Sequence, residues 1–226
     1  MNAFDIEQPC IPVVGTDDSF PVRRIYCIGR NYAKHVAEMG YDVKRSSPFY
    51  FAKPADAVVM SGATIDYPPR TANLHHEIEL VVAIGKAGSD VAASEALEHV
   101  YGYAVGIDLT RRDLQKAAKD KGRPWTTAKG FDQSAPISAI HRASRVGHPT
   151  AGRVWLAVNG EIRQDAGLNE LIWSVAESIA ELSTLFELAP GDLLFTGTPA
   201  GVGPLEPGDE VTGGIEGLDE IQITIR

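Results

Sequence analysis

Most of the chain consists of short apolar runs that end at turns rich in glycine and proline. Runs of about four to eight apolar residues between such breakers are typical of buried strands. The strands that this pattern predicts lie at 23–29, 49–54, 74–85 and 101–109, and strands and turns follow from residue 192 to the C-terminus. The first 22 residues contain proline and show no period, so we expect 1–22 to form an irregular arm and 23–226 a single domain.

Helical segments are short and few. The segment 31–39 is predicted to be a helix of about two turns, with Asn31 in the N-cap position and Gly40 as its C-terminal stop. A second short helix is predicted at 94–100.

Two further helices are marked by the spacing of a capping box, in which a Ser or Thr precedes an acid by three residues. Thr110 and Asp113 have this spacing and predict a helix that runs to Gly122. Ser174 and Glu177 begin the other helix. The apolar positions of this last helix follow the helical period and are Val175, Ile179, Leu182 and Phe186.

One hairpin is predicted at 154–164, where Asn159-Gly160 separates two stretches of strand character. These two residues favour the positive φ angles of a type I′ turn. With more strand than helix and no internal repeat, the chain is expected to adopt a strand-rich α+β fold.

Composition and charge narrow the function. The chain has 226 residues, a formal net charge of −9 and no basic tract, which argues against a nucleic-acid partner because phosphate neutralisation needs clustered lysine and arginine. No apolar run reaches the roughly 18 residues that a membrane span needs, and no signal pattern is present. Only Cys10 and Cys27 occur, so we expect two free thiols and a cytoplasmic protein.

Two acids interrupt the apolar segment at 74–85. Side chains two apart on a strand face the same way, so the carboxylates of Glu77 and Glu79 are expected about 7 Å apart. Like charges in apolar surroundings need a shared proton, a basic partner or a metal ion. A half-exposed strand whose acids pair with outside Arg or Lys is the alternative.

Asp108 supplies a third carboxylate, at the end of a second apolar strand. Three carboxylates form a hard oxygen donor set that predicts Mg²⁺, with Mn²⁺ or Ca²⁺ as alternatives. His75 shares a face with Glu77 and Glu79, so a set of these three residues competes with the set that contains Asp108. The local sequence leaves both sets open.

Six segments resemble, in order, the signature segments of the fumarylacetoacetate hydrolase family, and together they cover most of the chain. They are GRNYAKHVAEMG, FYFAKP, LHHEIELVVAIG, YGYAVGIDLTRRDLQ, TTAKGFDQSAPIS and FTGTPAGVG. Within the family, the chain is most similar to the short bacterial acylpyruvate hydrolases, in particular fumarylpyruvate hydrolases of the gentisate pathway. The resemblance implies a mixed β-sandwich roll, a homodimer, and Mg²⁺ or Mn²⁺ bound by Glu77, Glu79 and Asp108.

His35 and Glu38 are three residues apart on the predicted helix at 31–39 and can interact on one face. A carboxylate that orients an imidazole is a common way to make a general base near neutral pH, although a solvated surface pair has the same spacing. The family resemblance implies a dyad that activates water. Because so short a helix is unstable alone, we expect residues 31–45 to form a lid that orders when substrate binds.

Five more residues are candidates for the site, four of them through the resemblance. Lys129 matches a lysine that stabilises developing negative charge. Arg112 and Gln115, three apart at the start of the helix after Asp108, match residues that hold substrate oxygen and the carboxylates, and Lys53, at a strand end, matches a position near the site. Thr198 lies in a glycine-rich turn whose backbone N–H groups are free to cradle a carboxylate, with its hydroxyl beside them.

The expected reaction is hydrolysis of a carbon–carbon bond in a 2,4-dioxo acid, a small anionic 2-oxo acid substrate, with pyruvate as one product. Alternatives that use the same site are decarboxylation of oxaloacetate and enol–keto isomerisation or hydration of related 2-oxo acids. A non-catalytic anion-binding protein, which would need no metal, is the alternative of another class. A distal carboxylate, as in fumarylpyruvate, would require a cation such as Arg24, Arg30 or Arg123.

Overall fold

The computed structural model describes residues 3–38 and 47–226 of the chain, and its main element is a mixed sheet of eight strands. Seven strands follow one another in the order β4 (Phe49–Lys53), β3 (Arg24–Gly29), β15 (Asp192–Phe195), β8 (Ile78–Ile84), β9 (Val100–Ile107), β11 (Ala135–Ile137) and β5 (Val58–Met60), and β12 (His141–Arg142) pairs with β9. Two of the pairs, β3 with β15 and β5 with β11, are parallel. The others are antiparallel.

A second sheet has five strands, and two small sheets complete the β structure. The second sheet has the order β14 (Glu161–Gly167), β13 (Arg153–Val158), β17 (Glu210–Ile215), β18 (Ile221–Ile225) and β6 (Thr64–Ile65). The small sheets are β10 (Thr110–Arg111), β7 (Leu74–His76) and β16 (Gly203–Leu205), and β1 (Cys10–Pro12) with β2 (Ser19–Pro21).

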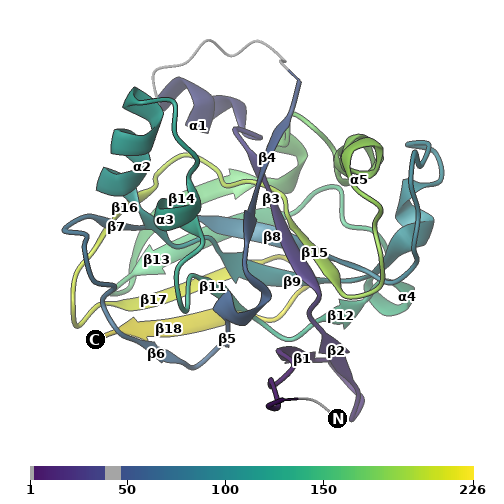
Figure 1. Ribbon diagram of the computed structural model, residues 1–226, viewed down its shortest axis with the longest axis horizontal. Coiled ribbons are helices and arrows are strands. Elements are labelled where there is room, and N and C mark those ends of the chain that lie inside the picture. Colours follow the sequence, from purple (N-terminus) through teal and green to yellow (C-terminus); the bar gives the residue numbers. More distant parts are fainter. Residues whose placement is uncertain (1–2, 39–46) are drawn as a thin grey trace.

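Helices are short in the described part of the chain. The α-helices are α1 (Ala33–Glu38), α2 (Arg112–Asp120), α3 (Thr126–Lys129), α4 (Ala143–Val146) and α5 (Val175–Leu185), and the 3-10 turns are η1 (Ala55–Ala57), η2 (Ala96–His99) and η3 (Leu168–Glu170). None of these helices is long and apolar enough to cross a membrane. The N-terminal hairpin of β1 and β2 lies at the opposite end of the molecule from α1 and α2 (Figure 1).

Strand β8 is buried on both faces and separates two apolar cores. Its side chains Leu80 and Val82 belong to the core shared with the five-stranded sheet. Val81 and Ala83 belong to a second core on the opposite face, which the N-terminal hairpin covers. By the alternation of a strand, Glu79 lies on this second face. Apolar side chains therefore occupy one end of this face of β8, and the acidic side chains lie at the other end.

Several sequence predictions are confirmed. The strands predicted at 23–29, 49–54 and 101–109 correspond to β3, β4 and β9. The hairpin joins β13 to β14 through Asn159 and Gly160, whose φ angles are +52° and +79°. The capping box of Ser174 and Glu177 is formed, with Glu177 N–H donating to the Ser174 hydroxyl. Both Cys10 and Cys27 are free thiols.

The predicted irregular arm is wrong. Residues 10–12 and 19–21 pair as β1 and β2, and Ile11 and Phe20 are buried in the second core. An alternating pattern over only three residues is too short to stand out from a loop in the sequence. The domain boundary at residue 22 stays a prediction.

The single strand predicted at 74–85 is also wrong, because the segment breaks at Glu77 into β7 and β8. These two strands belong to different sheets. The break depends on pairing of β7 with β16 and β10, which lie far away in the sequence. The helix predicted at 94–100 is the 3-10 turn η2, and the one-turn helices α3 and α4 were not predicted.

Two predicted helix caps do not form. Asn31 does not cap α1, which begins at Ala33, and its amide instead bonds the backbone of Trp173 and Thr196. Thr110 does not cap α2, because its hydroxyl donates to Glu77. Helix α2 ends at Asp120, before the positive φ of Gly122, as predicted. The predicted stop at Gly40 lies outside the described residues.

Candidate active site and metal centre

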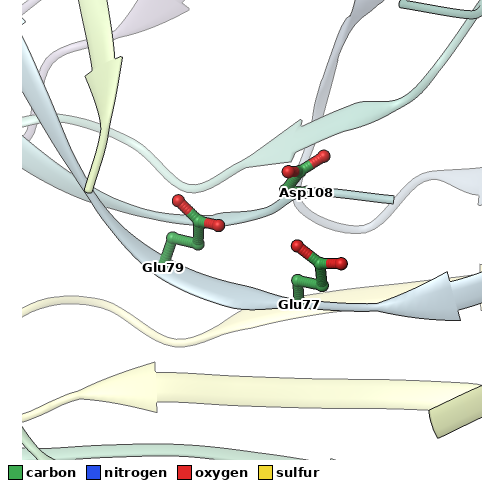
Figure 2. A group of neighbouring side chains, drawn as sticks. All are labelled: Glu77, Glu79 and Asp108. Carbon is green, nitrogen blue, oxygen red and sulfur yellow. The ribbon is translucent and has the colours of Figure 1, made fainter. Parts of the chain in front are cut away.

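Glu77, Glu79 and Asp108 are brought together by the antiparallel pairing of β8 with β9. Glu79 lies opposite Gly106 in this ladder, and the Asp108 N–H donates to the Glu77 carbonyl oxygen at 2.8 Å just beyond it. Figure 2 shows the side chains of Glu77 and Glu79 on the same side of the backbone, pointing toward Asp108. The short link after β7 therefore keeps both glutamates on one face, as the sequence predicts.

The three carboxylates form a compact, buried oxygen cluster. One carboxylate oxygen of each residue lies within 4.8 Å of the others, and the exposed fractions of Glu77, Glu79 and Asp108 are 6%, 2% and 0%. Buried carboxylates this close together are unfavourable unless cations balance their charge. The donor set fits a hard divalent cation.

Three cations balance the negative charge of the cluster. Lys129 Nζ donates to Glu77 Oε2 at 2.8 Å and to Asp108 Oδ2 at 2.5 Å. Arg112 Nη2 donates to Glu77 Oε1 at 2.5 Å. Lys53 Nζ forms an ion pair with Asp108 Oδ1 at 2.8 Å and also donates to the carbonyl oxygens of Leu109 and Lys129.

The pKa values of the two glutamates are pushed apart. Burial acts to raise the pKa of Glu77, but Lys129 and Arg112 outweigh it and hold this pKa well below its usual range. Burial raises the pKa of Glu79 well above its usual range, and the negative charges of Asp108 and Glu77 act in the same direction. Both causes favour the protonated form of Glu79, whereas a bound divalent cation would favour its charged form.

The competing ligand set with His75 does not form. The only group of three or more potential ligands found among the described residues is that of Glu77, Glu79 and Asp108. Both ring nitrogens of His75 are engaged, Nδ1 accepting from Arg112 and Nε2 facing Asn73 Oδ1 at 2.9 Å. The strand break at Glu77 removes the common face that the sequence pattern suggested.

His35 and Glu38 lie on one side of α1, as predicted. His35 Nδ1 is 3.3 Å from Glu38 Oε2, and His35 lines the same cavity as the three carboxylates. Glu38 is fixed from the other side by the Gly201 N–H at 3.2 Å. Burial lowers the pKa of His35, and Glu77 and Glu38 oppose this shift. The imidazole is therefore neutral, and able to accept a proton, at neutral pH.

The remaining predicted residues are spread around this cluster. Gln115 accepts a hydrogen bond from Arg112 at 2.6 Å. Thr198 lines the cavity, and its hydroxyl accepts from Gln164 at 2.8 Å. Lys53 lies behind Asp108 and does not belong to the cavity wall. The structure therefore places Lys53 under the carboxylates, away from the substrate position that the resemblance implies.

The cavity above the cluster is small, and the centres of water-sized molecules can occupy about 40 Å³ of it. Its polar and charged lining comprises Arg30, His35, Glu77, Glu79, Asp108, Arg112, Gln115, Lys119, Lys129 and Thr198, and its apolar lining comprises Ile28, Phe49, Phe51 and Trp125, with Gly29 and Gly197. Of the three arginines considered for a distal carboxylate, Arg30 lies on this wall, whereas Arg24 and Arg123 do not.

Sequence reasoning missed several residues that build the site. Gln164 ties the start of β8 to the turn at 198–199, since its amide oxygen accepts from Ile78 N–H and its amide nitrogen donates to Thr198 and Pro199. Gly197 donates its N–H to Glu79 at 2.7 Å and has a φ of +92°, which suits glycine. Lys119 was missed although it follows Arg112 by seven residues, a spacing that places both on one helix face.

The chain is similar in sequence to one protein family and to several known enzymes. The family described as "Fumarylacetoacetate (FAA) hydrolase C-terminal" matches residues 24–226. A fumarylpyruvate hydrolase of a Ralstonia species is 49% identical over 189 residues, 83% of this chain and 98% of that relative. The mitochondrial oxaloacetate tautomerase FAHD1 of Mus musculus is 42% identical over 204 residues, 90% of this chain and 92% of that relative.

A solved structure has nearly the same fold. The crystal structure of fumarylpyruvate hydrolase from Pseudomonas aeruginosa in complex with Mn²⁺ and pyruvate has a TM-score of 0.97 and 52% sequence identity. The match covers 100% of this chain and 99% of that one. The predicted strand-rich α+β fold of this family is thereby confirmed.

Proposed function

This chain belongs to the fumarylacetoacetate hydrolase family, and from that premise we propose that it hydrolyses a carbon–carbon bond in a 2,4-dioxo acid, with fumarylpyruvate as the substrate. The products are pyruvate and a carboxylic acid. The observation that carries the proposal is the convergence of Glu77, Glu79 and Asp108 within 4.8 Å in a cavity that also contains the His35 imidazole. The names of the two fumarylpyruvate hydrolases among the relatives support this substrate.

The difficult step in this reaction is the departure of carbon. A carbanion leaves only when its charge is delocalised, and in a 2,4-dioxo acid the departing fragment is the enolate of pyruvate. Glu77, Glu79 and Asp108 would hold the divalent cation. When bound, the cation would supply Lewis-acid stabilisation of negative charge on the oxygens of the 2-oxo acid.

His35 acts as the general base in this proposal. Its neutral imidazole takes a proton from water, and the water oxygen forms a bond to the C4 carbonyl carbon. Glu38, 3.3 Å from Nδ1, orients the ring and stabilises the imidazolium that forms. The C3–C4 bond then breaks, its electron pair remains on C3 as the enolate, and protonation of C3 gives pyruvate.

Lys129 stabilises the oxyanion that forms on C4. Its ammonium has three N–H donors and gives two of them to Glu77 and Asp108, so one can serve a substrate oxygen. The same contacts hold the two carboxylates at a fixed separation. Lys129 is nearly fully buried, which strengthens both effects because little water competes.

The other residues hold the substrate and the carboxylates. Arg112 bonds Glu77 and Gln115, and both Arg112 and Gln115 reach the cavity, where they position substrate oxygen. The Thr198 hydroxyl accepts from Gln164 and can donate its own proton to a substrate carboxylate. Lys53, from beneath, fixes Asp108. We further propose Mg²⁺ as the cation, from the three carboxylates and the family resemblance, and a cytoplasmic location, from the two free thiols. A homodimer and a role in aromatic degradation are proposed from the family resemblance alone.

A second candidate function is the conversion of oxaloacetate, because the 42% identical relative is named an oxaloacetate tautomerase. Tautomerisation needs proton transfer at an enolisable carbon and no attacking water, and decarboxylation needs no water either. The pair of His35 and Glu38 in the cavity favours water activation over decarboxylation, and it could also serve the proton transfer of a tautomerase.

Reaction in ¹⁸O-labelled water separates these functions. We expect the purified enzyme with Mg²⁺ or Mn²⁺ to convert fumarylpyruvate into pyruvate and fumarate that carries one ¹⁸O per turnover. Turnover of oxaloacetate alone, with no product from fumarylpyruvate, would contradict the proposal. A non-catalytic anion-binding protein would turn over neither substrate and would show no calorimetric signal with the metal.

A further inference from the structure

One face of α2 connects the carboxylate cluster to the outer part of the cavity. Arg112, Gln115 and Lys119 are spaced by three and four residues, so their side chains follow one another along this face. All three line the cavity. Seven residues of helix correspond to about 10 Å, so Lys119 lies roughly this far along the helix axis from Arg112.

Two cations and two aromatic rings form the outer wall, which we call the cation–aromatic wall: Arg30, Phe49, Lys119 and Trp125. Lys119 Nζ is 5.1 Å from the centre of the Trp125 ring, and the Arg30 guanidinium is 5.5 Å from the centre of Phe49. The two rings contact edge to face, with centres 5.3 Å apart. The wall is thus one connected unit that links β4, the end of β3 and α2.

The cation–aromatic wall concentrates positive charge. Burial lowers the pKa of Lys119 to about 8, and the charges of Arg112 and Arg30 act in the same direction. Positive charges gathered on the wall of a cavity attract an anionic ligand. The charge balance of the carboxylate cluster does not need these two cations, since Lys129, Lys53 and Arg112 already serve it.

We propose that Lys119 and Arg30 bind the far carboxylate of the substrate, so that this chain selects acylpyruvates whose acyl group itself ends in a carboxylate. This inference rests on the proposed hydrolysis and specifies its substrate class. In fumarylpyruvate, six carbon–carbon bonds of about 1.5 Å separate the two carboxyl carbons, and an extended zigzag of this kind spans roughly 7 to 8 Å. That length is comparable with the separation of Arg112 and Lys119 along α2.

Lys119→Met tests the proposal against a matched control on the same helix. Methionine keeps an apolar stem against Trp125 and removes the charge. The control is Lys116→Met, since Lys116 is 76% exposed and pairs with Asp120 outside the cavity. Each variant is assayed for kcat/KM with fumarylpyruvate and with acetylpyruvate, whose acyl group has no carboxylate.

We expect Lys119→Met to lower kcat/KM for fumarylpyruvate by about 10- to 100-fold, the loss of one charged hydrogen bond, and to change that for acetylpyruvate by less than about threefold. Lys116→Met should change neither value, and Lys119→Arg should retain most of the preference. Product inhibition by fumarate should weaken in Lys119→Met alone.

Two outcomes would overturn the inference: an equal loss with both substrates in Lys119→Met, or a wild-type enzyme that shows no preference for fumarylpyruvate. A wild-type enzyme that hydrolyses neither acylpyruvate would instead refute the proposed function. Oxaloacetate provides a further check, because its carboxylates are separated by only three carbon–carbon bonds and cannot span the cavity. Any turnover of oxaloacetate should therefore be unchanged in Lys119→Met, and a loss as large as that with fumarylpyruvate would count against the inference.

Discussion

The two halves of the site differ in how firmly the fold holds them. Glu79 lies in β8, Glu77 directly precedes β8 and Asp108 directly follows β9. Each of the three carboxylates accepts a hydrogen bond of 2.8 Å or shorter. The general base and its partner, His35 and Glu38, lie on the six-residue helix α1, and their side chains are 3.3 Å apart.

This difference separates two tasks in the reaction. The three carboxylates, which we call the strand-borne half, can stabilise charge without rearrangement. Electrostatic catalysis is most effective under this condition. His35 and Glu38 form the helix-borne half. The distance between them is long for a hydrogen bond, and the Glu38 side chain is 38% exposed. Catalytic hydrogen bonds often shorten only when substrate is bound, so we expect the pair of His35 and Glu38 to tighten at that stage. The prediction that residues 31–45 form a lid stays open, since residues 39–46 lie outside the described part.

The largest effect is expected from the strand-borne half. Asp108→Asn removes one negative ligand and should lower kcat/KM by at least about 10³-fold, because the several kcal/mol of charge stabilisation that the cation supplies are lost. Calorimetry should show a parallel loss of Mn²⁺ affinity. The exposed control Asp120→Asn should keep both the wild-type kcat/KM and the wild-type affinity for Mn²⁺. Wild-type activity in Asp108→Asn would show that these carboxylates hold no catalytic cation.

The next largest effect is expected from the helix-borne half. His35→Ala should lower kcat by about 10²- to 10⁴-fold, the usual contribution of a general base. Affinity for Mn²⁺ should change by less than about twofold, because no side chain of α1 belongs to the cluster of three carboxylates. Loss of the metal together with the activity would refute the division of the site into two halves.

Lys129→Met should affect both catalysis and stability. The oxyanion loses a donor, and kcat should fall by about 10²- to 10³-fold. In the metal-free protein, Glu77 and Asp108 are left buried with fewer partners, which should lower the free energy of unfolding by roughly 3 to 5 kcal/mol. Added Mn²⁺ should restore part of this difference, as seen in thermal unfolding curves. Equal destabilisation with and without metal would contradict a shared site.

The smallest effect is expected for Glu38→Gln, about tenfold in kcat through poorer orientation of His35. The pKa of His35 lies below its ordinary value through burial, and Glu38 raises it. His35 must be neutral to accept a proton, so activity should fall as the pH drops through this pKa, at a pH below about 6.5. Removal of the Glu38 charge should move this acidic limb of the pH profile to lower pH. A shift to higher pH would contradict the pairing.

The sequence predicted the residues of the strand-borne half better than the backbone that carries them. The spacing of Glu77 and Glu79 and the family resemblance together indicated the three carboxylates that the structure brings together. The strand break at Glu77 could not be predicted, because it depends on pairing of β7 with β16, more than a hundred residues away. Likewise, Thr110 and Asp113 have the spacing of a capping box, but the Thr110 hydroxyl donates to Glu77 instead. The Asp113 carboxylate accepts from the Thr71 hydroxyl.

Local signals were sufficient where the structure itself is local. The capping box of Ser174 and Glu177 and the turn at Asn159-Gly160 formed as predicted, since each depends only on near neighbours. Lys119 shows the opposite case. Its helical spacing from Arg112 was visible in the sequence, but its place in a cavity depends on Trp125 and on strands far away in the chain.

The most direct test is an anomalous-scattering map from crystals grown with Mn²⁺. If Glu77, Glu79 and Asp108 together bind the catalytic cation, the map will show one strong peak within coordination distance of all three carboxylates, and none in Asp108→Asn crystals. A map without a peak at these residues, from crystals of an enzyme that is active in the same Mn²⁺ buffer, would contradict it.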